Sequence, residues 1–420
     1  MTTNKNHNSP NVPNSTDKGN VIRNVPALRF PEFEGEWKKE QLGDTADFSK
    51  GAGISKEQLS EKGEPCILYG ELYTKYKSEV IYDIISKTDI DSTKLVRSQA
   101  NDVIIPSSGE TAEDIATARC VLKNNILLGG DLNIIRLHNH SGSFMSYQLN
   151  GKRKYDIAKV AQGVSVVHLY AEHLKGVNTY NPCMEEQEKI ARLLSLLDER
   201  IATQNKIIER YESLIRGLND SLYDQYGDDV LTSFSSLGLS YSGLSGKSAQ
   251  DFGSGKPYIT YLNVYSNNII NEKDFQYVAV KEGEKQNVVE YGDVLFTLSS
   301  ETPEEVGIGS VYLGNENVYL NSFCFGIHII NTKMAFPPYL SYYVSSTPFR
   351  KFIYPYAQGS TRFNLCKADF EKASIKLPSL ENQKRIYSIL SRIESKTETE
   401  KSLLDLYNSQ KQYLLRQMFI

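Results

Sequence analysis

The strongest constraint on the fold is a helical segment that occurs twice in the chain. Residues 184–201 read MEEQEKIARLLSLLDERI, and residues 380–397 read LENQKRIYSILSRIESKT. At an offset of 196 positions, these residues of the first copy recur unchanged in the second: Glu185/Glu381, Gln187/Gln383, Ile190/Ile386, Leu194/Leu390 and Ser195/Ser391. So dense a match at one offset indicates an internal duplication and predicts a chain built from two similar halves.

The duplication extends into the segments that precede each helical copy. Residues 161–163 (AQG) recur as 357–359 at the same offset. Further upstream the offset drifts, as loops of unequal length would cause, and residues 63–67 (GEPCI) align with 255–259 (GKPYI). We therefore expect each half of the chain to form one globular unit followed by one charged, periodic segment.

The globular units carry the pattern of mixed helix and sheet. Short apolar runs, such as 102–106 (DVIIP) and 293–298 (DVLFTL), lie between clusters of Gly, Ser and Asn and predict strands. Helices are expected around residues 144–155 and 338–352. The predicted fold class is α/β or α+β, with a pseudo-twofold internal repeat.

The periodic segments predict two long helices that pair as an antiparallel coiled coil. Apolar residues follow the alternating spacing of four and three that is typical of a heptad seam. Gln204 interrupts the first seam, and Glu400 stands at the repeat position of Gln204. The residues expected to pair the helices or to bind a partner are Ile190, Leu194, Leu197, Ile201, Ile208, Tyr211, Ile386, Leu390, Ile393, Leu404, Tyr407 and Leu414.

The composition argues against a membrane protein, a signal peptide and a zinc site. The chain has 420 residues and no run of about 18 apolar residues, so no membrane span is expected. The first 26 residues are rich in Asn, Ser and Thr and lack an apolar core, so they predict a disordered tail and not a signal peptide. The five cysteines never form a C-x-x-C pair, which favours reduced thiols in the cytoplasm and argues against a zinc site.

Local charge favours a nucleic-acid partner, although the net charge is −4. Residues 318–367 contain no acidic side chain, and the corresponding stretch 132–171 contains only Asp156. A solvated basic face is the simpler explanation for either stretch alone. The same bias at the same place in both halves favours binding to DNA phosphates.

Motifs that resemble catalytic sites fail on inspection. Residues 241–248 (YSGLSGKS) resemble a phosphate-binding loop but begin with Tyr where that loop needs Gly. Residues 336–339 (FPPY) lack the hydrogen-bonding first side chain of an amino-methyltransferase loop and are better explained as the start of a helix. His138 and His140 have no carboxylates at metal-ligand spacing. We therefore expect no catalytic residue, no metal and no cofactor in this chain.

The two copies of E-x-Q-x-x-I-x-x-x-L-S, each preceded by a proline (Pro182 and Pro378), resemble the specificity (S) subunits of type I restriction–modification systems. The opening Pro26-Ala27-Leu28-Arg29-Phe30-Pro31 and Glu36-Trp37 are also similar to the start of such subunits. The resemblance implies a non-catalytic, cytoplasmic, sequence-specific DNA-binding subunit that recognises a split site in double-stranded DNA. It also implies that the subunit scaffolds two modification (adenine methyltransferase) subunits. Restriction subunits would join the full complex, and S-adenosylmethionine and ATP would be bound by the partner subunits.

The resemblance also implies an organisation into five segments. They are a tail (1–26), a first target recognition domain (27–182), a central conserved helix (183–226), a second target recognition domain (227–378) and a C-terminal conserved helix (379–420).

Residues that face DNA are expected on polar loops ahead of the helices, because such loops can approach base edges. The candidates for bases are Ser107, Ser108, Gln162, Ser165, Ser299, Ser300, Gln358, Ser360 and Arg362. The candidates for phosphates are basic side chains close to those loops, namely Lys152, Arg153, Lys154, Arg350 and Lys351. The alternative for the two Gln-Gly pairs is that they are simply turns. The alternative for the whole chain is a tandem-domain, coiled-coil interaction scaffold that does not bind DNA.

Overall fold

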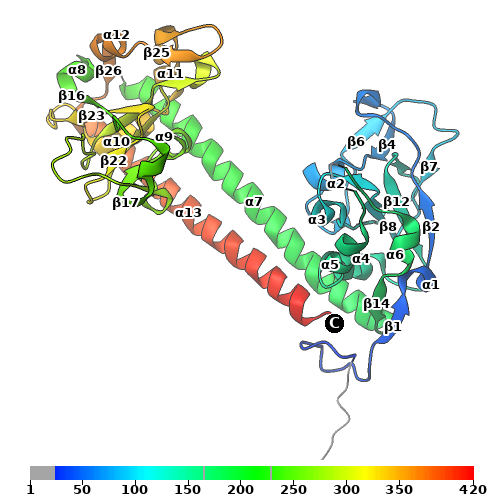
Figure 1. The fold of residues 1–420 in the computed structure, drawn as a ribbon. Coiled ribbons are helices and arrows are strands. Elements are labelled where there is room, and N and C mark those ends of the chain that lie inside the picture. The colour runs from blue at the N-terminus through cyan, green and yellow to red at the C-terminus, as the bar shows by residue number, and fades with distance from the viewer. Residues whose placement is uncertain (1–23, 164–165, 228) are drawn as a thin grey trace, which may run out of the picture. The chain divides into compact units, whose positions relative to one another are not determined.

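The computed structural model describes residues 24–163, 166–227 and 229–420. The described chain divides into two compact units (Figure 1). The first unit contains the chain up to Thr203 together with Leu404–Ile420, and the second contains Gln204–Leu403. Both long helices, α7 (Met184–Tyr226) and α13 (Leu380–Gln417), contribute to both units.

The helices α7 and α13 pair in antiparallel fashion, as the heptad pattern predicts. In the first unit, the Lys411 ammonium lies 2.6 Å from the Asp198 carboxylate. In the second unit, Lys401 lies 3.2 Å from Glu212. Because rising residue numbers in α7 meet falling numbers in α13, the helices run in opposite directions. All twelve apolar residues predicted for pairing are buried or half-buried.

The polar layer predicted in the seam is a direct contact between repeat-equivalent residues. The Gln204 amide nitrogen donates to the backbone oxygen of Glu400 at 3.0 Å and to its carboxylate at 2.6 Å. Gln204 is only 4% exposed, so this bond satisfies a buried amide. A buried polar pair of this kind fixes the register of the two helices.

The first unit stacks helices and a second sheet on opposite faces of a central sheet. The central sheet has the order β2-β12-β8-β10-β5, and the second sheet has the order β3-β6-β4-β11-β7. Alternating strand residues separate the two faces: Val103 and Ile105 pack against α4–α6, whereas Ile104 packs against the second sheet. The strands are β1 (Lys38–Gln41), β2 (Ala46–Lys50), β3 (Leu59–Ser60), β4 (Glu64–Ile67), β5 (Val80–Ile81), β6 (Ser86–Thr88), β7 (Val96–Arg97), β8 (Asp102–Pro106), β9 (Ser108–Gly109), β10 (Arg119–Val121), β11 (Leu127–Leu128), β12 (Leu132–Leu137), β13 (Val167–His168) and β14 (Asn178–Asn181). The short helices are α1 (Leu42–Thr45), α2 (Glu71–Thr74), α3 (Ala112–Ile115), α4 (Gly142–Asn150), α5 (Lys154–Val160) and α6 (Ala171–Lys175).

The second unit repeats this arrangement with fewer strands. Its central sheet has the order β16-β23-β19-β21, and its second sheet has the order β18-β17-β22. Val294 and Phe296 of β19 face the helices, and Leu295 faces the second sheet. The strands are β15 (Val230–Thr232), β16 (Gly238–Ser242), β17 (Phe252–Ile259), β18 (Gln276–Val278), β19 (Val294–Thr297), β20 (Ser299–Ser300), β21 (Gly309–Val311), β22 (Tyr319–Leu320), β23 (Cys324–Ile329), β24 (Ala357–Gln358), β25 (Phe363–Leu365) and β26 (Ile375–Leu377). The short helices are α8 (Phe234–Leu237), α9 (Tyr261–Ser266), α10 (Pro337–Tyr343), α11 (Thr347–Ile353) and α12 (Lys367–Lys372).

The repeated glutamine of the helix motif ties each globular part to the start of its long helix. Gln187 donates to the Pro182 carbonyl at 2.9 Å and accepts from the Ser141 amide at 2.9 Å. Gln383 donates to the Pro378 carbonyl at 2.9 Å and accepts from the Phe336 amide at 2.8 Å. Both glutamines are almost completely buried. The motif therefore repeats because it makes the same junction twice.

The departure between the two motifs also has a structural reason. Glu186 forms a two-pronged ion pair with Arg29, in which both nitrogen–oxygen distances are 2.8 Å. At the equivalent position of the second copy, the Asn382 amide donates to the Asp229 carboxylate at 3.0 Å. Glu186 thus pairs with a cationic residue, whereas the neutral Asn382 donates to an anionic residue.

Candidate nucleic-acid interface

The second unit brings most of its predicted base-facing residues together on one small sheet. Strand β20, which follows β19 directly, pairs with β25, and β25 pairs with β24 in a hairpin. Gln358 begins the hairpin turn, and Gly359 has a φ of +142°. A Cβ atom at Gly359 would lie 2.2 Å from the Arg362 carbonyl oxygen, so the turn requires glycine. The Gln-Gly pair is therefore a turn, and it is also the tip of the candidate site.

An exposed arginine of this hairpin lies beside an aromatic ring from the segment between β22 and β23. The Arg362 guanidinium donates to the Ser299 hydroxyl at 3.2 Å, and its central carbon lies 5.9 Å from the centre of the Phe323 ring. Phe323 is 56% exposed, and Arg362 is exposed as well. Gln358 and Ser360 are exposed beside them. Ser299 and Ser300 are buried, so they support the surface and do not form it.

Tyrosines of α9 and a carboxylate brace the same strand. The Tyr261 hydroxyl donates to the Ser299 carbonyl at 2.8 Å. The Glu305 carboxylate accepts from the Tyr265 hydroxyl at 2.8 Å and from the Ser300 hydroxyl at 3.0 Å. These hydrogen bonds, with Tyr265 the largest contributor, lower the pKa of Glu305, so the carboxylate stays charged.

Sequence reasoning missed these residues, although a signal for them exists. Tyr69 and Tyr73 precede Tyr261 and Tyr265 by 192 positions, which is the offset of the GEPCI and GKPYI match. In the first unit, the Tyr73 hydroxyl lies 3.5 Å from the Ser108 carbonyl. A helix tyrosine thus reaches the serine strand in both halves.

The first unit contains the corresponding site. Strand β13 pairs with β9, and Gln162 bridges to His168 through backbone hydrogen bonds of 2.9 and 2.7 Å. Gly163, like Gly359, has a positive φ, here +128°. Gln162 is exposed, Ser108 is half-buried, and Ser107 is buried. Ser165 lies outside the described residues.

Two of the arginines predicted to contact phosphates instead bind other groups of the protein. Arg350 donates to the carbonyl oxygens of Glu304, Val306 and Gly307, each at 2.7 Å, and burial lowers its pKa to about 10. Arg153 donates to the Ile420 backbone oxygen at 2.9 Å and pairs with Asp156 at 3.0 Å. Because both guanidiniums stabilise the fold, we leave them out of the interface proposed below.

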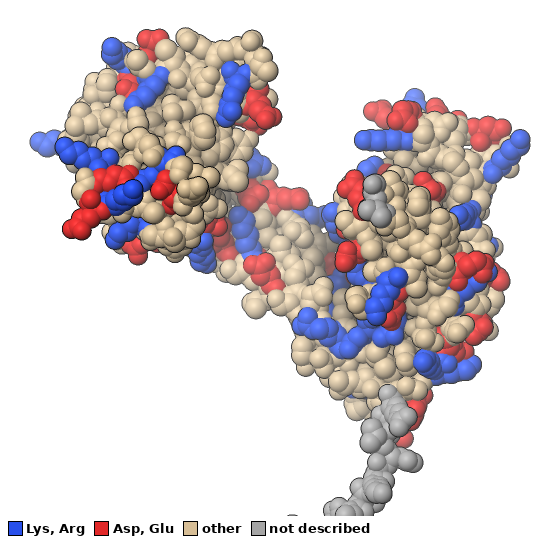
Figure 2. Space-filling view, viewed as in Figure 1, with Lys and Arg blue, Asp and Glu red and all other residues tan. Residues whose placement is uncertain are grey.

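The remaining phosphate candidates are lysines on a surface of mixed charge. Lys152 and Lys351 are exposed, and Lys154 is half-buried. Figure 2 shows Lys and Arg side chains interspersed with Asp and Glu over the visible surface of each unit. On the visible face, the basic side chains are therefore dispersed among acidic ones.

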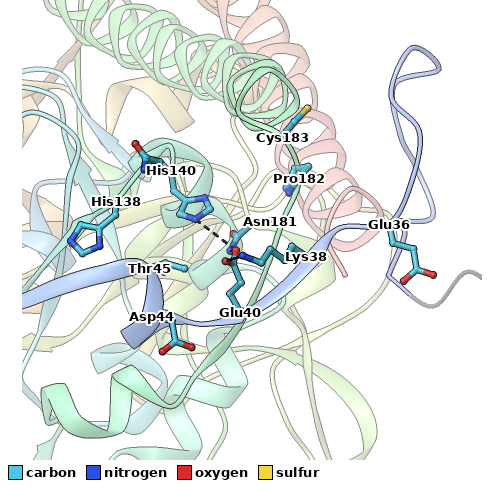
Figure 3. Close-up of a pocket in the computed structure, with 11 residues that line it drawn as sticks. Glu36, Lys38, Glu40, Asp44, Thr45, His138, His140, Asn181, Pro182 and Cys183 are labelled. Atoms are coloured by element: carbon cyan, nitrogen blue, oxygen red, sulfur yellow. Dashed lines mark hydrogen bonds and ion pairs between the residues drawn. The ribbon is translucent and has the colours of Figure 1, made fainter.

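A polar cavity of about 580 Å³ lies in the first unit beside the start of α7 (Figure 3). His140 points toward Glu40, with 3.7 Å between its Nε2 and the carboxylate. Its other ring nitrogen lies 3.0 Å from the Gln187 amide nitrogen. Burial lowers the pKa of His140, although the Glu40 charge opposes this effect. Within the described part of the chain, no group of three or more His, Cys, Asp and Glu side chains is arranged to hold a metal ion.

The segments that resemble enzyme motifs serve structural roles. Lys247, which stands at the lysine position of the phosphate-loop pattern, donates to the Ala279 carbonyl and pairs with Glu284, both at 2.6 Å. Pro337 and Pro338 open helix α10, as predicted for the FPPY segment. Among the helices of the described ranges, none has the length and apolar content that crossing a membrane requires.

Similar proteins agree with this architecture. Of solved structures, the S subunit of a type I restriction–modification system from M. genitalium matches 94% of this chain and 99% of its own, with 17% identity and a TM-score of 0.57. A structure described as showing complex assembly and conformational transition of the type I R-M system matches 90% of this chain and 96% of its own, with 16% identity and a TM-score of 0.55. At these identities the likeness establishes the fold alone.

A curated relative adds a partial sequence match. It is the type I restriction enzyme MjaVIII specificity subunit of Methanocaldococcus jannaschii, which is 24% identical over 206 residues. The match covers 48% of this chain and 44% of that relative, so the chain spans less than half of its length. The model of the type I restriction modification DNA specificity domain matches residues 34–213 and 244–406, which is most of the chain. The chain therefore belongs to the family of type I restriction–modification DNA specificity proteins.

Proposed function

We propose that this protein is the sequence-specific DNA-binding subunit of a type I restriction–modification complex and that each unit reads one half of a split site in double-stranded DNA. The observation that carries this proposal is the hairpin site found in both units. Each site joins a serine strand, a Gln-Gly turn and exposed polar side chains on a repeated scaffold. Two similar readers on one chain suit a site with two separate halves.

Exposed side chains of the hairpins supply the groups that read bases. The amides of Gln162 and Gln358 can each donate and accept, and Arg362 offers paired donors. Lys152, Lys154 and Lys351 are the proposed phosphate contacts. Since phosphate contacts release counterions, binding should weaken steeply as salt rises.

The paired helices are the proposed docking surface for two modification subunits. Large apolar side chains stay exposed along them: Leu196 and Leu214 of α7 are each 45% exposed, and Leu406 and Tyr413 of α13 are 65% and 52% exposed. Such side chains could contribute apolar contacts to a protein interface on the helix pair. Adenine methylation, S-adenosylmethionine and ATP belong to the partner subunits in this proposal, and restriction subunits complete the complex in the cytoplasm.

The proposed domains follow from these roles. Residues 27–182 and 227–378 form the two target recognition domains, and residues 183–226 and 379–420 form the conserved helices.

The test is to express the chain with its modification subunit and to sequence the methylome of the cells. The expected result is methylated adenine in one motif with two defined halves and an unspecified spacer. Fluorescence anisotropy should show specific, salt-sensitive binding to that motif by the complex and only weak binding by the isolated chain. If neither methylation nor DNA binding occurs with the complex assembled, the chain is an interaction scaffold and the proposal is wrong.

A further inference from the structure

The two hairpin sites can be compared residue by residue, because the same backbone hydrogen bonds recur in both. The Leu169 amide donates to the Ser107 carbonyl at 3.0 Å, and the Leu365 amide donates to the Leu298 carbonyl at 2.8 Å. These bonds fix the alignment of the serine strand with the second strand of each hairpin. The internal repeat therefore allows each residue of one hairpin site to be matched with an equivalent residue of the other.

Further bonds align the residues at the tips. The Ser107 amide donates to the Asp131 carbonyl at 2.7 Å, and the Leu298 amide donates to the Phe323 carbonyl at 2.9 Å. Asp131 and Phe323 are thus equivalent. A Cβ on Gly163 would meet the Val166 oxygen at 2.0 Å, just as one on Gly359 would meet that of Arg362 at 2.2 Å. Val166 and Arg362 are therefore equivalent as well.

The equivalent positions divide into a shared frame and a variable tip. The two Gln-Gly turns and the serine at the start of β9 and β20 are the same in both units. Among the residues that the structure describes in both sites, exposed positions that differ include Asp131/Phe323, Val166/Arg362 and His168/Asn364. These differing side chains sit on the shared frame of turn and serine strand, so they are presented at equivalent places in the two units. We call these three pairs the tip pairs. If the two half-sites have different bases, side chains at these positions are expected to differ between the units.

The chemistry of the tip pairs predicts different bases. In the second unit, the Ser299 hydroxyl and the Phe323 ring hold the Arg362 guanidinium in place. A planar guanidinium presented in this way matches the O6 and N7 acceptors of guanine. In the first unit, Asp131 offers a carboxylate, which accepts from the amino group of cytosine, and Val166 offers an apolar contact for the thymine methyl group.

Resting on the proposed function, we infer that the tip pairs determine which bases each unit reads, and that Arg362, supported by Phe323, selects a guanine in the half-site of the second unit. The first unit has no guanidinium at the equivalent position. It therefore reads a different base there.

The test exchanges the tips. One variant gives the second unit the side chains of the first, Arg362→Val with Phe323→Asp, and a second variant carries Arg362→Lys alone. The reciprocal variant of the first unit is Val166→Arg, with Asp131 kept because its φ of +58° disfavours a bulky aromatic side chain. The matched control is Lys285→Val, which removes an exposed cation of the second unit away from the hairpin. Each variant is assembled with the modification subunit, and its DNA preference is read by selection from a library with every position of the site randomised.

The expected result is a change at one or two positions of a single half-site. Loss of the Arg362 contact should weaken binding to the original motif roughly 5- to 150-fold, while the other half stays unchanged. The reciprocal variant should change only the other half, and the control should leave both intact. If the wild-type complex selects a split motif and all tip variants select the same motif with equal affinity, the inference is overturned and the proposed function stands. If the wild-type complex selects no motif, the proposed function fails first.

Discussion

Replacing Lys411 by methionine is expected to destabilise the first unit strongly, because Lys411 is the cation of a buried ionic cluster. Its ammonium lies 2.5 Å from the Glu79 carboxylate and 2.6 Å from the Asp198 carboxylate. Tyr147 and Ser78 also donate to Asp198, each at 2.8 Å. The Lys411, Glu79 and Asp198 side chains are 12%, 9% and 5% exposed.

The magnitude follows from the burial of both anions. Burial raises the pKa of Glu79, and the Lys411 charge opposes this effect. Removing the cation breaks both direct ion pairs and leaves two buried carboxylates with the Arg119 guanidinium as their remaining nearby counter-charge. Breaking a buried pair costs about 3–5 kcal/mol. For a unit of this size, that loss corresponds to a Tm lower by roughly 6–20 °C.

The assay is chemical and thermal denaturation of the full chain, with unfolding monitored by circular dichroism. Lys401→Met is the matched control on the same helix, since its partners Glu212 and Glu398 are 40% and 66% exposed. The control should cost less than about 1 kcal/mol. Adding Asp198→Asn to Lys411→Met should recover part of the loss, because it removes one of the two carboxylates and leaves Glu79 to offset the Arg119 charge. A Lys411→Met chain as stable as the control would refute the reasoning.

Three further predictions concern the junctions and the turn. Gln187→Ala and Gln383→Ala should each cost about 1–3 kcal/mol, because each leaves buried backbone groups unpaired; denaturation that matches the wild type would contradict this. The lowered folded-state pKa of His140 means that its protonation opposes folding, so stability of the first unit should fall as pH drops from about 7.5 to 5.5. His140→Ala, which copies its repeat equivalent Ala335, should remove that part of the slope in melts across this range. Gly359→Ala should distort the β24–β25 hairpin and disturb recognition of one half-site only, as methylome sequencing would reveal; disturbance of both halves would count against separate readers.

The architecture was predictable from the sequence because it depends on periodic patterns. The heptad seam predicted α7, α13 and their pairing, and the apolar runs predicted β8 and β19. Each helix expected around residues 144–155 and 338–352 is instead two short helices, α4 and α5 in the first unit and α10 and α11 in the second. Gly151 ends α4, and Ser346 caps the start of α11.

The candidate site was only partly predictable, because the partners of a long charged side chain come from distant segments. Arg153 and Arg350 stand in basic stretches, yet the Ile420 backbone oxygen and the 304–307 loop occupy them. Lys411 lies in the second periodic segment, and nothing in the local sequence indicates Glu79 as its partner. The Gln-Gly turns were found because they repeat. Tyr261 and Tyr265 also repeat, but their role depends on contacts with Ser299 and Glu305 that no local pattern shows.

Replacement of one recognition unit tests the central claim most directly. Residues 230–378 are exchanged for the equivalent segment of another family member, the chimera is expressed with the same modification subunit, and the methylome is sequenced. Both helices that make the proposed docking surface are kept in this exchange. The expected result is a methylated motif in which one half is new and the other half is identical to that of the wild type. A motif in which both halves change, or in which neither does, would contradict the claim that the two units read separate half-sites.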